Sequence, residues 1–478
     1  MAPSRVAPVP ASDASLVRAI GLGSAILFVI GGVIGSGIFL TTGVMASSIP
    51  SASLLLLAWS IGGVLAIAGG LTYAEMGAMF PRSGGVYVFL REAYGPLLAF
   101  LYGWAAMLVV LSGGIAAVAV GFADYVSYFV PSLSPQVVVW SLDTPLGTLT
   151  IFAGQIVAVT CIAVLGAINY VGVRTGNFVN VLMTAAKVGG LAVLPVMAIL
   201  AARVDPVFTP IVPPDLPRPA AAFGVAMIAV LWTYESWYFI TYAAGEIKDP
   251  QRNVPRALVA GILALTTIYL TVNVAYVFAL SIPEMQGVSR IGERAAAALV
   301  GPSGGTFVAL TVVISTFGCN VAAILAGSRL LFAMAADGVF FPAAARVHPV
   351  YRTPHVAIVG LTGWAAILAL TGSYQQLFTY VMFASILFSV FAGFALFRLR
   401  WTMPERPRPY RTWGYPVVPI VFIAGAVTFV ANTLIERPGE SFAGLGLVAL
   451  GLPVYWYWRR AGRNSHSAVL ADPTGSRP

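Results

Sequence analysis

The first long apolar segment of this sequence contains a glycine-rich stretch, Gly31-Gly32-Val33-Ile34-Gly35-Ser36-Gly37, with four glycines in seven residues. The bilayer contains no water to hydrogen-bond the backbone of an interrupted helix. A break there is therefore expected only where other groups bind the freed N–H and C=O groups. Such a break presents the positive N-terminal end of a half-helix to an anion such as a carboxylate, as secondary transporters do. A glycine-rich helix-packing face is the competing interpretation of this segment taken alone.

A second interruption lies in the sixth apolar segment, where Trp232-Thr233-Tyr234-Glu235-Ser236 places an acid and hydroxyl groups inside an apolar run. Inverted-repeat transporters carry their second broken helix five spans after the first. Two interruptions at this spacing favour a pair of broken helices that hold a small charged solute between them.

Two more ionisable side chains fall inside apolar segments, Lys187 in the fifth and Glu75 near the inner end of the second. A lysine at the centre of a bilayer costs about 2.5–3.5 kcal/mol even on lenient scales. We therefore expect Lys187 to face a polar interior. An intramembrane acid such as Glu75 is a functional candidate for the same reason.

The elements that position these residues are membrane helices. Apolar residues make up 59% of the chain and charged residues 9%, whereas soluble domains carry about 25% charged residues. The composition predicts an all-α integral membrane protein. Segments of roughly 20 apolar residues occur twelve times, near 21–44, 52–79, 96–129, 150–171, 178–201, 221–243, 257–280, 305–334, 356–372, 376–399, 416–435 and 442–458.

The distribution of charge predicts the orientation. Most of the 26 Lys and Arg residues fall on the segments that twelve spans place on the same side as the N-terminus. The positive-inside rule then places both termini in the cytoplasm. We expect the protein in the plasma (inner) membrane. The polar ends, 1–17 and 461–478, are predicted to be disordered cytoplasmic tails.

Several kinds of chemistry are not expected. Cys161 and Cys319 lie within predicted spans, so neither a disulfide nor a thiolate metal site is expected. The dinucleotide fingerprint fails after Gly35-Ser36-Gly37, and no phosphate-binding loop of the Gly-x-x-x-x-Gly-Lys-Ser/Thr type occurs. We expect no metal, no cofactor, no catalytic residue and no nucleic-acid partner.

The chain resembles the amino acid–polyamine–organocation (APC) superfamily of transporters, and within it the L-amino-acid transporter (LAT) type. Four segments, in order and at family spacing, carry the resemblance: Ile34–Phe39; Tyr73–Gly77 with Phe80–Gly85; Glu246–Arg256; and Ser328–Leu330 leading to His348-Pro349 and Thr353-Pro354. The resemblance implies a leucine-transporter fold, with helices 1 and 6 broken. It makes residues 18–201 and 221–400 two inverted repeats of five spans, with two extra spans at 415–460.

The resemblance also implies how a substrate is held. Backbone N–H groups around Gly35, Ser36 and Gly37 would bind the α-carboxylate. Carbonyl groups of Val33, Trp232 and Glu235 would accept hydrogen bonds from the α-ammonium. Ile34 and Thr233, in the same two segments, are also expected to bind the substrate.

Three side chains complete the implied site. Trp232 occupies the position where the family usually has a gating phenylalanine. Ser112 and Cys319 are candidates for the subsite that holds the substrate side chain.

Two positions depart from the family pattern. Glu235 lies where the family has a small or acidic residue, so pairing with a substrate amine, sensing protons and capping the second half-helix all remain open. In the eighth span the family asparagine comes one place early, as Asn320, so residue-by-residue transfer is unsafe on that helix.

In similar sodium-independent transporters a lysine at the place of Lys187 replaces a sodium ion between the first and eighth spans. That likeness assigns Lys187 to coupling, either as a permanent charge in an exchanger or as a group that loses its proton in a symporter. The family motif around Glu75 implies an inner-gate salt bridge with Arg82.

Together these features predict a sodium-independent carrier of small neutral L-amino acids, an exchanger or a proton-coupled transporter, that works by alternating access. A cationic amino acid or polyamine transporter is the alternative that Glu235 leaves open, and a membrane amino acid sensor is the alternative from another class. The predicted outer loop 130–149 has no cysteine, so no disulfide-linked heavy chain is expected. The oligomeric state is not determined by these features.

Overall fold

The computed structural model describes residues 16–144, 147–371 and 374–460. Apart from residues 16–17, the two predicted tails lie outside the described residues. Within the described residues, ten helical segments are long and apolar enough to cross a membrane. The sixth and ninth predicted spans correspond to two shorter apolar helices, Pro219–Tyr234 and His355–Ala369.

The first predicted span is divided into two helices. α1 covers Leu22–Val33 and α2 covers Gly37–Ser48, with residues 34–36 non-helical between them. A Cβ on Gly31 would collide with Thr184, so this glycine lets α1 approach a neighbouring helix closely. A Cβ on Gly37 would lie 2.5 Å from Thr233 Oγ1 and 3.0 Å from its Cα. Both interpretations of the segment therefore apply: the glycines flank a helix break, and they permit close helix packing.

The sixth span is interrupted in the same way. α9 (Pro219–Tyr234) ends before Glu235, Ser236 adopts a positive φ of 78°, and the helix resumes only as the short α10 (Phe239–Tyr242). Arg218, which precedes α9, also has a left-handed backbone conformation. The other helices of this half are α11 (Pro250–Ala279), α12 (Ile282–Met285), α13 (Ile291–Val300), α14 (Pro302–Ala336), α15 (His355–Ala369) and α16 (Tyr374–Thr402).

The first half contains the remaining inner helices of the bundle. They are α3 (Ala52–Met79), the short α4 (Val86–Tyr94), α5 (Pro96–Ala105), α6 (Leu111–Phe129), α7 (Ala153–Val171) and α8 (Val173–Ala201). A π-helical turn, Ala106–Val110, joins α5 to α6. The chain ends with α17 (Val417–Glu436) and α18 (Pro438–Ala449), which continues as helix over residues 451–460 after a turn at Leu450.

Two departures from an all-helical chain occur among the described residues: a parallel β-bridge between Ile20 and Ile247, and a β-hairpin. β1 (Val138–Thr144) pairs antiparallel with β2 (Gly147–Phe152), with Thr144 opposite Gly147. It forms the predicted outer connection before α7, where alternating apolar residues favour strands over a helix.

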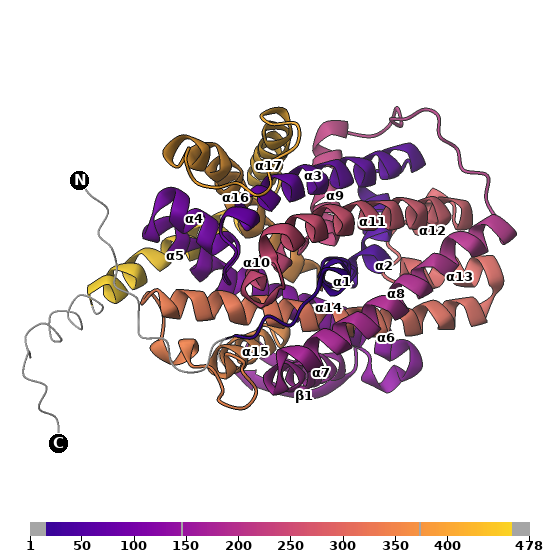
Figure 1. Ribbon diagram of the computed structural model, residues 1–478. Helices are drawn as coiled ribbons and strands as arrows, with labels where there is room; N and C mark the ends of the chain where they lie inside the picture. The colour runs from indigo at the N-terminus through magenta and orange to yellow at the C-terminus, as the bar shows by residue number, and fades with distance from the viewer. Residues whose placement is uncertain (1–15, 145–146, 372–373, 461–478) are drawn as a thin grey trace, which may run out of the picture.

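The packing places the broken first span inside the bundle. α1 contacts α8, α11 and α14, while α2 contacts α9. Figure 1 shows α1 near the middle of the molecule, with α16 and α17 on one side and α7 and α8 on another. Because residues 28–43, which include the break, are all buried, the groups freed at the break face protein and not lipid.

Candidate functional site

A small cavity lies where the two broken spans meet. It has a volume of about 40 Å³ and is enclosed by the breaks in the first and sixth spans together with α6, α14 and α16. Of the residues that the sequence suggests for substrate binding, eight line this cavity: Val33, Gly35, Ser36, Gly37, Trp232, Thr233, Glu235 and Cys319.

The helix ends around the cavity have opposite polarity. α2 begins at Gly37, so its first turn brings the partial positive charge of a helix N-terminus to the cavity. α1 ends at Val33 and α9 at Tyr234, which brings carbonyl ends with partial negative charge to the same place. A zwitterion with its carboxylate toward α2 and its ammonium toward α1 and α9 matches this arrangement.

Tyr269 of α11 joins the two breaks. Its hydroxyl lies 3.1 Å from the carbonyl oxygens of both Val33 and Thr233. A second link runs between the hydroxyls of Thr41 and Thr233, 3.1 Å apart. The buried phenol of Tyr269 therefore holds the ends of α1 and α9 in fixed relation, which preorganises both sides of the cavity.

Lys187 lies directly behind the first break. Its ammonium donates to the carbonyl oxygens of Gly31, Ile34 and Ser315 at 2.8, 2.7 and 3.1 Å. The side chain is fully buried. The Ser315 hydroxyl also donates to Ile34, at 3.0 Å. The lysine thus joins the non-helical turn of the first span to α14, which is the geometry expected for a cation between the first and eighth spans.

Ile34 and Ser112 do not line the cavity. The Ile34 carbonyl faces Lys187 and Ser315 instead. The Ser112 hydroxyl donates to the Met107 carbonyl five residues earlier. The π-helical turn before Ser112 changes the rotation of the helix, and its neighbours Leu111 and Gly114 line the cavity in its place.

Asn320 is a lining residue that the sequence analysis did not select. Its amide nitrogen donates to the Ile115 carbonyl at 3.1 Å, whereas its buried Oδ1 has no hydrogen-bond partner among the described residues. The adjacent Cys319 donates to the Gly32 carbonyl at 3.0 Å. Both residues line the cavity, so Asn320 Oδ1 is an acceptor available to a substrate hydroxyl or ammonium. An amide in the middle of an apolar segment was the signal for it.

Glu235 lies at the end of α9, with only 8% of its surface exposed. Its carboxylate accepts hydrogen bonds from Tyr238 and, at 2.5 Å, from Ser385 of α16. The described contacts of this carboxylate are with hydroxyls and not with N–H groups of α10. They therefore give no support to the helix-capping role, and the substrate-pairing and proton-sensing roles remain.

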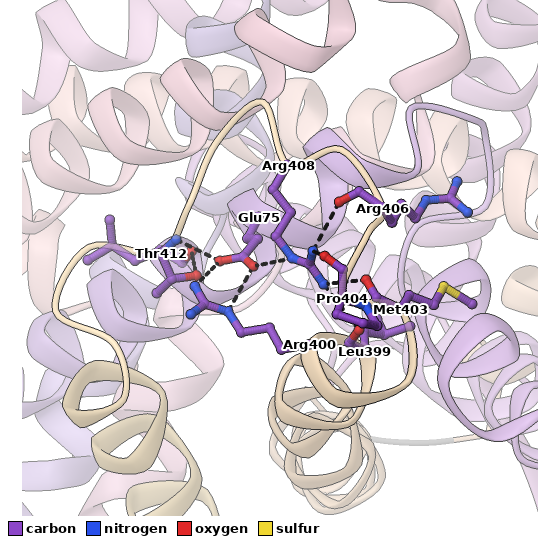
Figure 2. A network of polar contacts seen from close by, with 9 residues as sticks. Glu75, Leu399, Arg400, Met403, Pro404, Arg406, Arg408 and Thr412 are labelled. Carbon is purple, nitrogen blue, oxygen red and sulfur yellow. Dashed lines mark hydrogen bonds and ion pairs between the residues drawn. The ribbon is translucent and has the colours of Figure 1, made fainter.

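The expected Glu75–Arg82 salt bridge is wrong. Figure 2 shows Glu75 between Arg400 and Arg408, with nitrogen–oxygen distances of 2.6 and 3.3 Å. The backbone N–H of Thr412 donates to the same carboxylate at 2.7 Å. Arg82 pairs with Glu92 instead.

The physical reason for this correction is where the helices end. α3 stops at Met79, so Arg82 lies beyond the end of the helix that carries Glu75. The turn at Gly84 and Gly85, both with positive φ, then brings Glu92 of α4 to Arg82. The C-terminal end of α16 brings Arg400 to Glu75 in its place.

A second buried ion pair ties the segment after α10 to α14. Arg329 Nε lies 2.5 Å from Glu246 Oε1, and both side chains are almost fully buried. The Glu246 carbonyl also accepts from the N–H groups of Ala19 and Ile20, each at 3.0 Å. This end of the bundle is therefore closed by the strand-like residues before α1, the segment after α10 and α14. No cluster of potential metal ligands occurs among the described residues.

Comparisons with known proteins show the family of this chain. A family model described as "Amino acid permease" matches residues 20–448. The serine/threonine exchanger SteT of Bacillus subtilis (strain 168) is 32% identical over 450 residues, which cover 93% of this chain and 97% of that protein. The large neutral amino acids transporter small subunit 2 of Homo sapiens is 30% identical, with 93% and 82% covered. The Asc-type amino acid transporter 1 of Mus musculus is 28% identical, with 93% and 82% covered.

Proposed function

Because this chain belongs to the amino acid permease family, we propose that it is a sodium-independent secondary transporter of small neutral L-amino acids that works by alternating access. Its relatives are transporters and not enzymes. The observation that carries the proposal is the cavity at the two helix breaks, where opposite helix ends face each other.

The size of the cavity supports a small substrate. A volume of about 40 Å³ exceeds the roughly 10–15 Å³ that one water needs, but it leaves little room beyond an α-carboxylate, an α-ammonium and a short side chain. Trp232, only 8% exposed, forms one wall and is the proposed gate. The names of two relatives, serine/threonine exchanger and Asc-type amino acid transporter, point the same way.

Lys187 supports independence from sodium. Its ammonium already bonds the carbonyls of Gly31, Ile34 and Ser315, which are the kind of hard oxygen ligands that a monovalent metal ion would otherwise use. Exchange is the first mode that we propose, since one relative is named an exchanger. Proton coupling through Lys187 is the alternative.

We further propose the topology of the carrier. Residues 18–201 and 221–400 are the two inverted repeats, residues 415–460 pack outside them, and both termini lie in the cytoplasm of a cell with the protein in its plasma membrane. Cys161 and Cys319 are buried within helices, and this supports a transporter that has no disulfide-linked heavy chain.

A cationic amino acid or polyamine is the second candidate substrate, and Glu235 is the observation that favours it. This nearly buried carboxylate lines the cavity, where it could bind a second ammonium group. A carboxylate held by two hydroxyls is also compatible with a neutral substrate.

Uptake into liposomes tests the proposal. The full chain is reconstituted and supplied with labelled serine, threonine, alanine, leucine, arginine and putrescine, with choline in place of sodium. Each uptake is measured with and without unlabelled substrate inside, and with and without a pH gradient. Uptake of serine that depends on internal serine is the expected result. Strong uptake or competition by putrescine would move the assignment to the second candidate, and uptake of nothing would oppose transport altogether.

A further inference from the structure

A groove of about 830 Å³ lies away from the substrate cavity, between α3, α11 and the segment 403–416 that connects α16 to α17. Its lining combines two arginines of α11 with apolar and aromatic residues. No residue of this groove belongs to the substrate cavity.

The face that α11 presents to the groove changes character along its length. Arg252 and Arg256 are four residues apart and therefore lie on one face. Val259 and Leu263 continue that lining toward the middle of the helix. At 1.5 Å per residue, Arg252 to Leu263 spans about 16 Å, roughly half of a hydrocarbon core about 30 Å thick. The apolar part of that length, from Val259 to Leu263, covers about 6 Å. A groove that is charged at one end and apolar toward the bilayer centre matches the headgroup and the first part of an acyl chain of a phospholipid.

The charge of the groove is not balanced by the protein. Arg252 and Arg256 are exposed, no acidic residue lines the groove, and neither arginine forms an ion pair within the described residues. By contrast, the nearby Arg400 and Arg408 are both held by Glu75. Two guanidinium groups one helical turn apart repel each other, so a bound phosphate would remove that repulsion and accept charge-assisted hydrogen bonds.

Two aromatic residues, Tyr410 and Trp413, also line the groove. Trp413 is 75% exposed. Exposed tryptophan and tyrosine side chains are typical of the level of lipid headgroups. Both lie on the segment 403–416, so the aromatic residues and the arginines face the groove from opposite sides.

We propose that this groove binds a phospholipid with an anionic headgroup, its phosphate held by Arg252 and Arg256 and one acyl chain lying along Val259 and Leu263. The lipid belongs to the leaflet at the arginine-rich end of the bundle. The inference concerns the membrane and not the transported substrate, so it stands apart from the proposed function.

The bound lipid stabilises the segment that closes this end of the bundle. Thr412, between the two aromatic residues, donates from its backbone to Glu75 and from its hydroxyl to the Leu71 carbonyl at 3.2 Å, and Leu71 also lines the groove. Figure 2 shows this segment passing over the Glu75 carboxylate. A lipid wedged between α11 and Trp413 therefore restrains the same loop that holds the ion-pair network.

The test measures thermal unfolding of the full chain in detergent with added dioleoyl phosphatidylglycerol, dioleoyl phosphatidylcholine or glycerol phosphate. Native mass spectrometry then counts the lipids that remain bound. The groove variant is Arg252→Gln with Arg256→Gln. Its matched control, Arg174→Gln with Arg346→Gln, removes two exposed arginines elsewhere and changes the net charge equally. Ala260→Trp fills the groove without changing charge.

We expect phosphatidylglycerol to raise the unfolding temperature of the wild type and of the control. The groove variant should need roughly tenfold to thirtyfold more lipid, since each basic residue near an anionic surface contributes a factor of about five. Ala260→Trp should lose the effect as well. Equal responses of the groove and control variants, equal protection by phosphatidylcholine, or equal protection by glycerol phosphate would each overturn the proposal.

Discussion

The ammonium of Lys187 lies 2.7 Å from the carbonyl oxygen of Ile34, the residue at which α1 has ended and α2 has not yet begun. The lysine side chain therefore occupies the turn that separates the two half-helices. Lys187 also bonds Ser315 of α14. Any motion of α1 relative to α14 must therefore break one of these hydrogen bonds or move Lys187. This relationship makes Lys187 the residue whose replacement tells most about coupling.

Replacing Lys187 by alanine should slow transport more than it weakens binding, because the ammonium lies behind the cavity and does not line it. Each carbonyl left without a donor costs about 1–3 kcal/mol. Ser315→Ala, which removes a neutral donor from Ile34, is the matched control. Uptake by wild type and variants is compared with sodium replaced by choline, at external pH 5 to 8. Loss of wild-type transport without sodium, or a wild-type transport rate in Lys187→Ala, would contradict the coupling role of Lys187. A pH dependence seen only in the wild type favours a symporter.

Gly114→Val should block serine uptake by filling the cavity. Gly114 lines the cavity, and a Cβ there meets no atom within 4 Å, so the added methyl groups enter space that the substrate needs. Overfilling a packed site costs about 1–3 kcal/mol, which corresponds to about fivefold to 150-fold in affinity. Gly189→Val, at an exposed helical glycine with equally open surroundings, should leave uptake unchanged. Normal affinity in the Gly114 variant would place the substrate elsewhere.

Substitutions at Gly35 and Gly37 also test the substrate site, but they disturb helix packing as well. A side chain at Gly37 would press on the Cα of Thr233, and one at Gly35 would lie 3.0 Å from Cys319 Sγ. Valine at Gly37 should therefore abolish binding, but it also disturbs the contact between α2 and α9. Retained affinity in a folded Gly37→Val protein would contradict the carboxylate site at this break.

Glu235→Gln separates the two candidate substrates. The amide keeps the shape and can still accept from Tyr238 and Ser385, but it removes the negative charge. If the substrate is neutral, serine uptake should stay within a few-fold of wild type, because in the proposed site backbone groups hold the α-carboxylate and the α-ammonium. A decarboxylated amine should not compete with either protein. Loss of serine uptake in Glu235→Gln, with normal uptake in Ser385→Ala, would instead show that the charge is required.

Glu75→Gln should destabilise the protein far more than Arg82→Gln. Glu75 is fully buried and Arg408 nearly so, and removing one partner of a buried pair costs about 3–5 kcal/mol. Arg82 is 46% exposed in its pair with Glu92, and a surface pair contributes about 0–1 kcal/mol. Thermal unfolding of both variants, with expression level as a second readout, measures the difference. Equal effects would mean that Glu75 does not depend on Arg400 and Arg408.

Acid pH should weaken the contact made by α12. Hydrogen bonds from the Ser281 backbone and hydroxyl, and then from Arg203, lower the pKa of Glu284 from 4.5 to about 2. A lowered pKa contributes stability that is complete above pH 4.5 and is lost as the pH falls toward 2. The difference in unfolding temperature between wild type and Glu284→Gln should therefore be constant from pH 8 to 5.5 and shrink below pH 4.5. A constant difference down to pH 3 would contradict this contribution.

Much of the architecture follows from local sequence. Runs of about 20 apolar residues specify membrane helices because the backbone must bond within itself there. The glycines around residue 35 and the polar groups around Glu235 mark the interruptions, and the cost of a buried ammonium predicted that Lys187 faces a polar interior. The ends of α1, α2 and α9 then fall where these residues are, since helix ends depend mainly on near neighbours.

Tertiary structure alone decided which groups face one another. The family motif suggested the nearby Arg82 as the partner of Glu75, but α3 ends before Arg82. The partner is instead Arg400 of α16, 325 residues further along the chain. Ser112 turns away from the cavity and Asn320 lines it. Side-chain direction depends on helix rotation, which a single π-turn shifts and which sequence spacing does not record.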